Sequence, residues 1–313
     1  MAELNLIPRV SLAELTTIRI GGTADWFTRV YEVEQLAAAI AWATERHLPF
    51  LFLGEGSNIL FPDSGFAGLV IKNRFLGFER YADEVQVAGG ENLGEVIQRV
   101  NRMRLAGLEC MYGIPGTVAG AVVGNAGAYG QEIRQSIIEV TTWSPAGMQT
   151  FDCEGMQFGY RHSILKDRRD LFVLNCRLRL KPAAENLTVT SDEILRKRLV
   201  RYPIGLRCPG SFFKNVLVSQ LSPEVLAGIP ADFIHFGKIP AGRLLEEVGA
   251  KGASRGDALI ADYHGNLLIN RRLASSADVL ALAEEYAQKV RDRFQVRLEP
   301  EILIVERAEG RQQ

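Results

Sequence analysis

Cysteine and histidine are scarce in this sequence, and neither sign of charge is in excess. The 313 residues include 4 cysteines and 4 histidines, none at CxxC or metal-ligand spacing. A disulfide framework, a zinc site and any other metal site are therefore not predicted. The 36 Lys and Arg residues balance 37 Asp and Glu residues to a net charge of −1, whereas proteins that bind nucleic acid through its phosphates usually carry a basic excess. We expect a protein of the reducing cytoplasm without a metal or a nucleic-acid partner.

The sequence also lacks a clear membrane-spanning or secretory segment. Residues 1–10 carry Glu3 and Arg9 and have no apolar core of signal-peptide length. The uncharged stretch 113–130 reaches the length of a short span, but its six glycines, Pro115 and Asn125 favour loops and turns that bring the backbone close to a ligand. We expect no membrane association and, because no exposed apolar stripe stands out, a monomer.

Hydrophobic periodicity predicts three lobes of mixed α and β structure, with boundaries at 1–76, 77–185 and 186–313. Helices are expected at residues 32–47, 93–100, 192–201, 240–248 and 277–294, the last with a capping box at Ser275 and Asp278. Strands are expected at 50–53, 68–71, 84–87, 137–143, 171–180 and, interrupted by Pro300, 296–305.

Two glycine-containing segments are candidates for binding an anionic cofactor. Residues 54–58 (GEGSN) follow an apolar strand, and their backbone N–H groups can form a nest for a phosphate. They match neither GxGxxG nor a Walker loop, and a tight strand exit explains them equally well. A functional role is favoured more strongly for the glycine-rich segment 113–130. That many glycines cost backbone entropy on folding, and close approach of the backbone to a ligand would explain why they are there.

Four further features are candidates for charge recognition and proton transfer. Arg161 in Tyr-Arg-His-Ser can hold a carboxylate, or form a surface ion pair. The run 196–214 has six basic residues and no acidic one, which suits an anionic ligand or a solvated helix face. Ser211, followed by a lysine and an amide, can donate a proton to a developing charge. In Leu-Glu-Pro-Glu near the end, Glu301 or its neighbour can point into a site, or the proline can simply interrupt an edge strand.

Seven motifs in order resemble the UDP-N-acetylenolpyruvoylglucosamine reductases, a family also called UDP-N-acetylmuramate dehydrogenases. The motifs are TIRIGG at 17–22, GEGSN, GIPGTVAGAVVGNAGAYG, YRxS, GSFFKN, IPAGRLLEE and LEPE, and the resemblance spans residues 15–305. It implies an α+β protein with a two-lobed FAD-binding fold of the vanillyl-alcohol-oxidase type and a C-terminal α/β substrate-binding lobe. The short stretch after Ser163 implies the shorter subtype, which lacks a tyrosine-bearing loop over the substrate.

The resemblance further implies an enzyme with non-covalent FAD and with NADPH as co-substrate. Its reaction is reduction of UDP-N-acetylglucosamine enolpyruvate to UDP-N-acetylmuramate for peptidoglycan synthesis, and hence for cell wall biogenesis, cell shape and cell division. A hydride passes from flavin N5 to the β-carbon, and the electrons move into the carboxylate as an enolate-like dianion. An FAD oxidase of the same fold and a non-catalytic flavin- or nucleotide-sugar-binding module are the alternatives. Neither requires Arg161, Ser211 and Glu301 together.

The resemblance assigns roles to individual residues. Arg161 grips the substrate carboxylate, Ser211 protonates the α-carbon and Glu301 stabilises the intermediate, while Pro209 departs from the alanine common in the family. The residues implied in cofactor binding are Arg19, Gly54, Glu55, Gly56, Ser57, Asn58, Ile114, Pro115, Gly116, Thr117, Gly120, Ala121, Asn125 and Gly127. Those implied in substrate binding are Lys214, Asn215, Arg207 and His264, with the basic cluster from Arg196 to Arg207, or part of it, facing the diphosphate.

Overall fold

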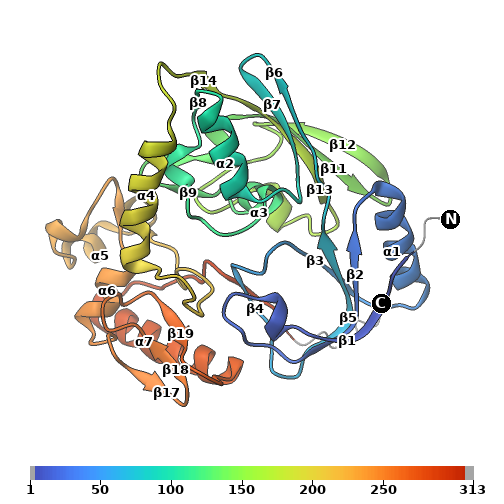
Figure 1. Cartoon of the computed structure of the whole chain (residues 1–313). Coiled ribbons are helices and arrows are strands. Elements are labelled where there is room, and N and C mark those ends of the chain that lie inside the picture. Colours follow the sequence, from blue (N-terminus) through green and yellow to red (C-terminus); the bar gives the residue numbers. More distant parts are fainter. Residues whose placement is uncertain (1–3, 307–313) are drawn as a thin grey trace. The chain divides into compact units, whose positions relative to one another are not determined.

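The computed structural model describes residues 4–306 and divides the chain into two units (Figure 1). Unit 1 comprises Met1–Val10, Asp25–Glu55 and Ala67–Pro203. Unit 2 comprises Ser11–Ala24, Gly56–Phe66 and Ile204–Gln313. The three lobe boundaries expected from the sequence remain a prediction.

Unit 1 contains a four-stranded sheet covered by one helix. The strand order is β1-β2-β5-β3, with β1 at Ile7–Ser11, β2 at Thr23–Val30, β5 at Phe66–Asn73 and β3 at Phe50–Leu53. Helix α1, Val33–Glu45, lies beside this sheet and buries Leu36, Ala39, Ile40 and Ala43 (Figure 1). That spacing puts the four side chains on one helical face, so the predicted helix and strand are both confirmed.

A second, antiparallel sheet of unit 1 has the order β12-β11-β13-β7-β6. The strands are β12 Gly147–Asp152, β11 Ile137–Ser144, β13 Phe172–Arg179, β7 Glu84–Ala88 and β6 Phe78–Tyr81. Its alternating buried residues share a core with α2, Leu93–Arg102, and α3, Val118–Val123. Helix α4, Thr188–Arg201, contacts α2 and the 3-10 turn η2, Glu109–Met111. Short pairs join β8 Leu105–Ala106 to β14 Lys181–Pro182, and β9 Gly127–Ala128 to β10 Gln131–Glu132.

The expectation of loops and turns throughout 113–130 is wrong for its centre. Residues Val118–Val123 form α3 because Thr117 caps the helix and Val118 and Val122 are buried in the core. The glycines at the two ends keep the flanking backbone irregular.

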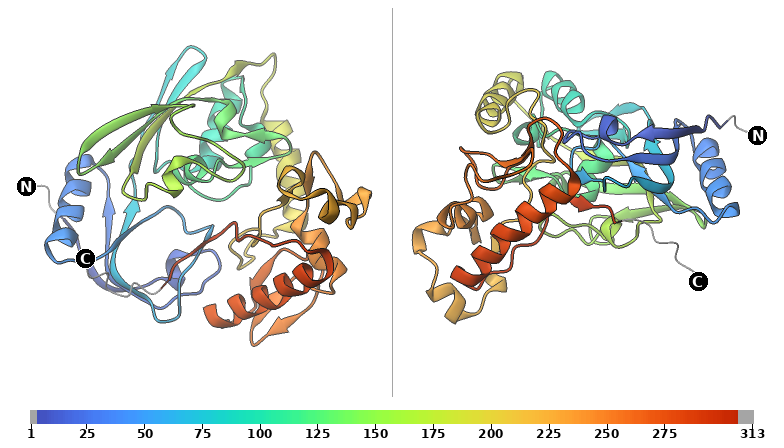
Figure 2. Two further views of the ribbon diagram at one scale, coloured as in Figure 1. Left: turned by 180° about the vertical axis from the view of Figure 1, so that it is seen from behind. Right: turned by 90° about the horizontal axis from the view of Figure 1, so that it is seen from below.

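In unit 2, a hydrophobic core packs a small antiparallel sheet against a long helix. The sheet is β17 Ser254–Arg255, β18 Ala258–Ile260 and β19 Leu268–Asn270. Helix α7, Ser276–Phe294, is the long helix of unit 2 in both views of Figure 2; it packs against β17 and β18, and its predicted Ser275 cap is confirmed. The smaller elements are α5 Pro223–Ala227, α6 Ala241–Glu247, the pair β15 Val216–Leu217 and β16 Lys238–Ile239, and the parallel pair β4 Ile59–Leu60 and β20 Leu303–Ile304.

The strand expected at 296–305 is mostly wrong. Only Leu303–Ile304 form a regular strand, together with an isolated bridge between Pro300 and Phe213. Proline has no N–H to donate to a ladder, so regular pairing fails around residue 300.

Candidate active site

In unit 1, the first glycine turn lies against the start of α3. A Cβ on Gly54 would stand 2.9 Å from Thr117 Oγ1, so any other residue here would require the Thr117 hydroxyl to move. The Thr117 hydroxyl accepts a hydrogen bond from the Gly120 N–H at 3.2 Å, and the Gly116 carbonyl accepts one from Leu93 N–H at 3.0 Å. The two predicted cofactor segments are therefore neighbours through Gly54 and Thr117.

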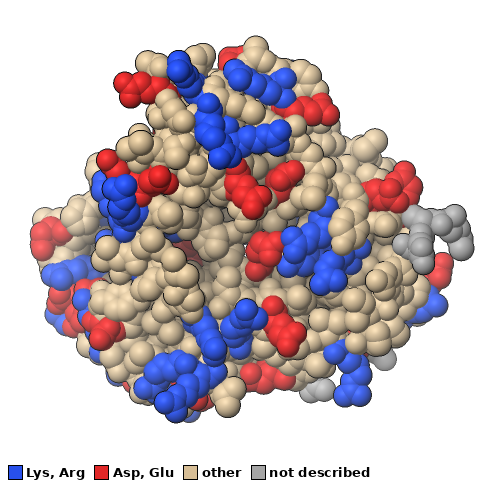
Figure 3. Space-filling view, viewed as in Figure 1, with Lys and Arg blue, Asp and Glu red and all other residues tan. Residues whose placement is uncertain are grey.

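Glu55, a predicted cofactor residue, is held by two cations of unit 1. Its carboxylate lies 3.1 Å from Lys72 Nζ and 2.9 Å from an Arg74 Nη1, and the Lys72 side chain is only 7% exposed. Glu55 thus compensates a buried ammonium, a role that the sequence does not signal. Figure 3 shows that basic and acidic residues alternate over this face of the molecule, without a large patch of one sign.

Arg161 stands in a turn that is tied to the glycine-rich segment. It has φ +55°, and the turn is closed by Gly159 N–H donating to the His162 carbonyl at 3.0 Å. The fully buried Asn125 donates from Nδ2 to the Gly159 carbonyl at 2.8 Å, and Ser163 Oγ donates to the Val123 carbonyl at 2.8 Å. Asn125, predicted to bind the cofactor, therefore fixes the turn that carries the predicted carboxylate-binding arginine.

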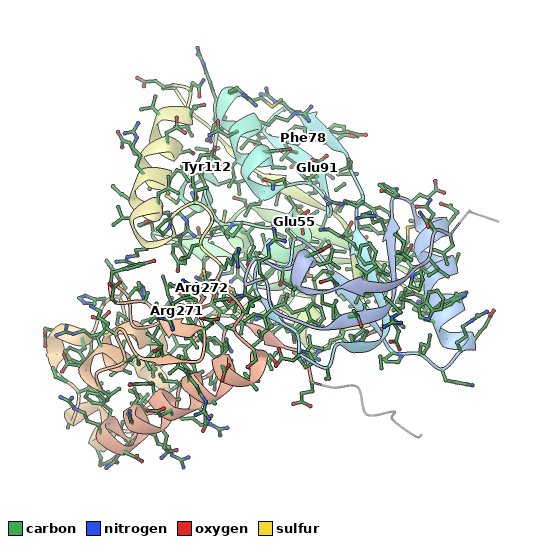
Figure 4. The ribbon with its side chains drawn as sticks, turned by 60° about the horizontal axis from the view of Figure 1, so that its bottom comes forward. Glu55, Phe78, Glu91, Tyr112, Arg271 and Arg272 are labelled. Atoms are coloured by element: carbon green, nitrogen blue, oxygen red, sulfur yellow. The ribbon has the colours of Figure 1, made fainter. Side chains whose placement is uncertain are left out.

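A cavity of about 630 Å3 in unit 1 is lined by the predicted cofactor residues Ile114 and Pro115. Phe78, Glu91 and Tyr112 also line it and are labelled in Figure 4. The sequence analysis did not predict these three residues, because none of them stands in a recognisable motif. Its lining also includes the charged side chains of Glu95, Arg99 and Arg102, so the cavity combines apolar, aromatic and charged surface beside the loop predicted to hold the cofactor.

The other predicted cofactor residues of unit 1 lie around α3. Gly120 and Ala121 are in α3, and Gly127 is in β9. A Cβ on Gly127 would stand 2.6 Å from the Gln131 carbonyl oxygen. Gly127 is therefore required by the β9–β10 turn itself.

In unit 2, backbone pairing brings the segments of Ser211 and Glu301 together. The Glu301 N–H donates to the Phe212 carbonyl at 2.8 Å, and the Lys214 N–H donates to the Glu299 carbonyl at 2.9 Å. Ser211 precedes one of these paired residues directly. The two predicted catalytic residues of this unit, 90 positions apart in the sequence, are thus placed on adjacent segments.

Asn266 anchors the segment that carries Ser211, and sequence reasoning missed it. Its Oδ1 accepts from Phe213 N–H at 2.9 Å, its Nδ2 donates to the Phe213 carbonyl at 2.8 Å, and its own carbonyl accepts from Phe212 N–H at 3.0 Å. The predicted substrate residue His264 lies beside it, with Nδ1 accepting from Asn266 N–H at 3.1 Å. The buried amide of Asn266 thus pairs both backbone groups of Phe213, two residues after Ser211.

Two predicted substrate residues next to Ser211 have partners within the protein. Lys214 Nζ lies 3.3 Å from a Glu299 carboxylate oxygen, and this ion pair is largely exposed on the glutamate side. Asn215 Oδ1 accepts from Ala241 N–H at 3.2 Å, in the first turn of α6. Asn215 thereby connects the Ser211 segment to the predicted IPAGRLLEE helix.

The second half of the GEGSN turn belongs to unit 2. Gly56 has φ +66°, and a Cβ there would stand 2.0 Å from the Leu15 carbonyl oxygen. Asn58 Nδ2 donates to the Pro209 carbonyl at 3.3 Å, and the Asn58 carbonyl accepts from Leu303 N–H at 2.9 Å. A Cβ on Gly210 would stand 4.0 Å from the Ser57 carbonyl oxygen. Residues 56–58 therefore pack next to the backbone that precedes Ser211.

Buried Asn270 brings arginine-bearing segments of unit 2 together. Its Nδ2 donates to the carbonyls of Ile18 at 3.0 Å and Arg19 at 3.2 Å, and its N–H donates to the Arg207 carbonyl at 2.9 Å. Arg207 Nη1 donates to the Arg272 carbonyl at 3.1 Å. Arg272 and its neighbour Arg271, both labelled in Figure 4, are exposed and were not predicted as site residues.

Within residues 4–306, no group of three or more His, Cys, Asp or Glu residues is arranged to hold a metal ion. No helix within the same range is long and apolar enough to cross a membrane.

Comparisons with known proteins define the class of the chain. An FAD binding domain family matches residues 24–151, and the family of the C-terminal domain of UDP-N-acetylenolpyruvoylglucosamine reductase matches residues 202–305. The fold and these matches are those of an FAD-dependent oxidoreductase. The expected α+β class, an FAD-binding region followed by a C-terminal lobe, is confirmed.

The full-length relatives agree with both matches. The chain is 36% identical over 295 residues to UDP-N-acetylenolpyruvoylglucosamine reductase of Solibacter usitatus, covering 94% of this chain and 95% of that relative. It is 36% identical over 303 residues to the enzyme of the same name from Acaryochloris marina, with coverages of 95% and 92%. The crystal structure of UDP-N-acetylenolpyruvylglucosamine reductase from Thermus caldophilus superimposes with a TM-score of 0.74 at 30% identity, covering 97% of this chain and 100% of that one. The chain belongs to the UDP-N-acetylenolpyruvoylglucosamine reductase family, as the ordered motifs predicted.

Proposed function

We propose that the protein catalyses the NADPH-dependent, FAD-mediated reduction of UDP-N-acetylglucosamine enolpyruvate to UDP-N-acetylmuramate. Family membership over nearly the whole chain supports the reaction class. The observation that carries the proposal is the hydrogen bond from Glu301 N–H to the Phe212 carbonyl, because it holds the segments of a proton donor and a carboxylate side by side. Neither an oxidase nor a binding module requires that pairing together with Arg161.

The residues present fit FAD. Glycine at 54 permits contact with Thr117, and Gly116 has φ +137°, so the backbone can approach a diphosphate closely. Ile114 and Pro115 line the cavity with Tyr112, which provides apolar surface for a ring. Neither segment contains a histidine or cysteine for a covalent link. The chemistry supplied by bound FAD is delivery of a hydride, obtained from NADPH, to the β-carbon of the enolpyruvyl double bond.

The chain's own residues manage charge and proton during that addition. When hydride adds to the β-carbon, the electron pair of the double bond moves toward the carboxylate, which gains one negative charge. The Arg161 guanidinium holds this carboxylate through parallel N–H bonds, and the turn fixed by Asn125 keeps it oriented. Ser211 Oγ then gives its proton to the α-carbon and takes up a proton from solvent, so that one hydride and one proton are added to the substrate in total. Glu301 helps to stabilise the intermediate, and Arg207 with part of the basic run 196–207 binds the substrate diphosphate.

The proton-donor role is tested by Ser211→Ala, with Ser219→Ala at an exposed position as the matched control. NADPH should still reduce the flavin of Ser211→Ala at the normal rate, whereas substrate should fail to reoxidise it. Reoxidation of Ser219→Ala should remain normal. Unchanged reoxidation of Ser211→Ala would remove the proton-donor role.

A further inference from the structure

Asn125 has both donors of its side-chain amide bonded within the protein. The residue follows helix α3, is 0% exposed and has φ +42°. Its Nδ2 donates to the Gly159 carbonyl at 2.8 Å and to Glu132 Oε2 at 3.2 Å, while its Oδ1 accepts from Arg134 N–H at 3.4 Å. An asparagine amide has two N–H donors, so neither is left over for a bound cofactor. These contacts assign the Asn125 side chain a role within the protein.

Glu132, in β10, is the acidic member of this group. One carboxylate oxygen, Oε2, accepts from Asn125 Nδ2 and also from Arg134 Nε, the latter at 2.7 Å. The Glu132 side chain is 19% exposed, and its backbone N–H donates to Gln135 Oε1 at 3.1 Å. A Cβ on Gly127, its partner in β9, would stand 2.8 Å from Glu132 Cγ, so glycine at 127 leaves room for this side chain. The carboxylate therefore has a fixed position between Asn125 and Arg134.

These contacts allow one orientation of the Asn125 amide. A backbone carbonyl and a carboxylate accept hydrogen bonds but donate none. An amide turned by 180° would place Oδ1 against the oxygens of Gly159 and Glu132, and its NH2 group against the Arg134 N–H. Because a hydrogen bond to a carboxylate is stronger than one to a neutral acceptor, Glu132 adds most to the preference for the observed orientation.

The Gly159 carbonyl lies at the base of the turn that carries Arg161. Gly159 and His162 exchange both backbone hydrogen bonds, at 3.0 Å and 3.3 Å, so Tyr160 and Arg161 form the two corners of a tight turn. Arg161 has φ +55° there, a left-handed conformation that a residue other than glycine keeps only where its surroundings hold it. The 2.8 Å bond from Asn125 to the Gly159 carbonyl supplies such support from a different segment.

We propose that Glu132 is a positioning residue for Arg161 and acts through the amide of Asn125. This rests on the proposed function, in which Arg161 holds the substrate carboxylate. Glu132 fixes the amide, the amide fixes the Gly159 carbonyl, and the turn then presents the guanidinium in the orientation that gives two parallel hydrogen bonds to a carboxylate. Because reacting groups tolerate little misplacement, loss of this support impairs the reaction with substrate and leaves the reduction of the flavin unchanged.

The test compares Glu132→Met, which keeps the length of the side chain but removes both oxygens, with Glu84→Met. Glu84 is also in unit 1, its side chain is 12% exposed, and it pairs with Arg177 and Arg179, neither of them a predicted site residue. Four quantities are measured for each purified holoenzyme: FAD content, the rate of flavin reduction by NADPH, the dissociation constant of substrate for the oxidised enzyme and the rate of flavin reoxidation by saturating substrate.

Glu132→Met should change only the two quantities that involve substrate. The dissociation constant should rise by about 10-fold, as expected for loss of one charge-assisted hydrogen bond, and reoxidation should slow by about 10- to 100-fold. Glu132→Gln, which keeps one oxygen as an acceptor, should recover part of both. Glu84→Met should behave as wild type in all four.

A double-mutant cycle shows whether the effect passes through Arg161. In enzyme that already carries Arg161→Gln, no guanidinium is left to position, so Glu132→Met should raise the dissociation constant by less than about twofold. The same 10-fold rise with and without Arg161 would give Glu132 a separate role and overturn the inference. If Glu132→Met does not fold, the cycle is run with Glu132→Gln, and additive effects overturn the inference in the same way.

Each other result also overturns the inference. Loss of FAD or slower reduction by NADPH in Glu132→Met would assign the contact between Glu132 and Asn125 to the cofactor site. Four unchanged quantities would show that Asn125 supports the turn without Glu132. Equal effects in Glu84→Met would indicate a general effect of removing a carboxylate from unit 1. A wild-type enzyme that substrate fails to reoxidise would refute the proposed function, whereas additive effects in an enzyme that reoxidises normally would refute this inference alone.

Discussion

Replacing Asn266 with alanine should uncouple the Ser211 segment from its support. The change removes two hydrogen bonds, of 2.9 Å and 2.8 Å, from both backbone groups of Phe213, which is 4% exposed. Each buried group left unpaired costs about 1–3 kcal/mol, so the two together should lower the free energy of unfolding by about 2–6 kcal/mol. For a unit of this size the midpoint of thermal unfolding should fall by roughly 6–20 °C. Because reacting groups tolerate little misplacement, reoxidation by substrate should slow by about 10- to 100-fold.

The matched control is Asn73→Ala in unit 1. Asn73 is also buried, and its amide also makes two bonds to backbone groups, to the Val173 carbonyl at 3.1 Å and from Phe75 N–H at 3.0 Å. Both variants should unfold earlier by differential scanning fluorimetry, but only Asn266→Ala should lose the substrate half-reaction at a temperature where both are folded. Normal turnover of Asn266→Ala with a lowered midpoint would refute its positioning role. An unchanged midpoint would refute the energetic reasoning.

Gly56→Ala places a Cβ 2.0 Å from the Leu15 carbonyl oxygen and should lower the free energy of unfolding, measured in urea, by at least about 3 kcal/mol. Its control Gly252→Ala, at φ +76° with nothing within 4 Å of the new Cβ, should lower it by only about 1 kcal/mol. Equal losses would contradict the steric argument. Glu55→Gln should cost about 2 kcal/mol because it leaves the ammonium of Lys72, 7% exposed, without its carboxylate, whereas Glu285→Gln, which breaks an exposed pair with Lys289, should cost under about 0.5 kcal/mol. Burial raises the pKa of the Cys176 thiol from 9.0 to about 12, so the folded state keeps a proton that the unfolded state loses above pH 9.0. Between these two pH values, the free energy of unfolding of wild type, measured by urea titration, should fall by about 1.4 kcal/mol per pH unit more than that of Cys176→Ala. Equal pH slopes for the two proteins would show that the thiol ionises normally.

The sequence predicts the regular elements well where one periodicity dominates. Helix α1 and strand β3 were expected almost to the residue, because Leu36 and Ile40 mark a helical face and Phe50–Leu53 is a short apolar run before a glycine. Helix α3 was missed, since the entropic cost of its glycine was weighed without the burial of Val118 and Val122. The strand predicted at 296–305 extends too far across Pro300, since only Leu303–Ile304 form a strand. Alternating apolar residues do not show whether a neighbouring strand is there to accept and donate the backbone hydrogen bonds.

The site residues divide in the same way. The resemblance to the family assigns catalytic roles to Arg161, Ser211 and Glu301, whereas side-chain chemistry alone left a surface ion pair for Arg161 and an edge-strand interruption for the Glu301 segment open. The residues that hold them in place, Asn266 for Ser211 and Asn125 for Arg161, act through single amides on the backbone of distant segments. Such pairings depend on tertiary structure, so a buried asparagine in the sequence gives no signal of its partner.

The central claim is that the protein moves electrons from NADPH to an enolpyruvyl sugar nucleotide through bound FAD. The most direct measurement is an anaerobic stopped-flow trace of the flavin absorbance of the purified protein, with NADPH added first and UDP-N-acetylglucosamine enolpyruvate second. The account predicts bleaching by NADPH followed by full recovery on addition of the substrate. Bleaching without recovery would contradict the proposed substrate and favour an oxidase of the same fold, and a protein that binds no flavin even when FAD is supplied would contradict the account as a whole.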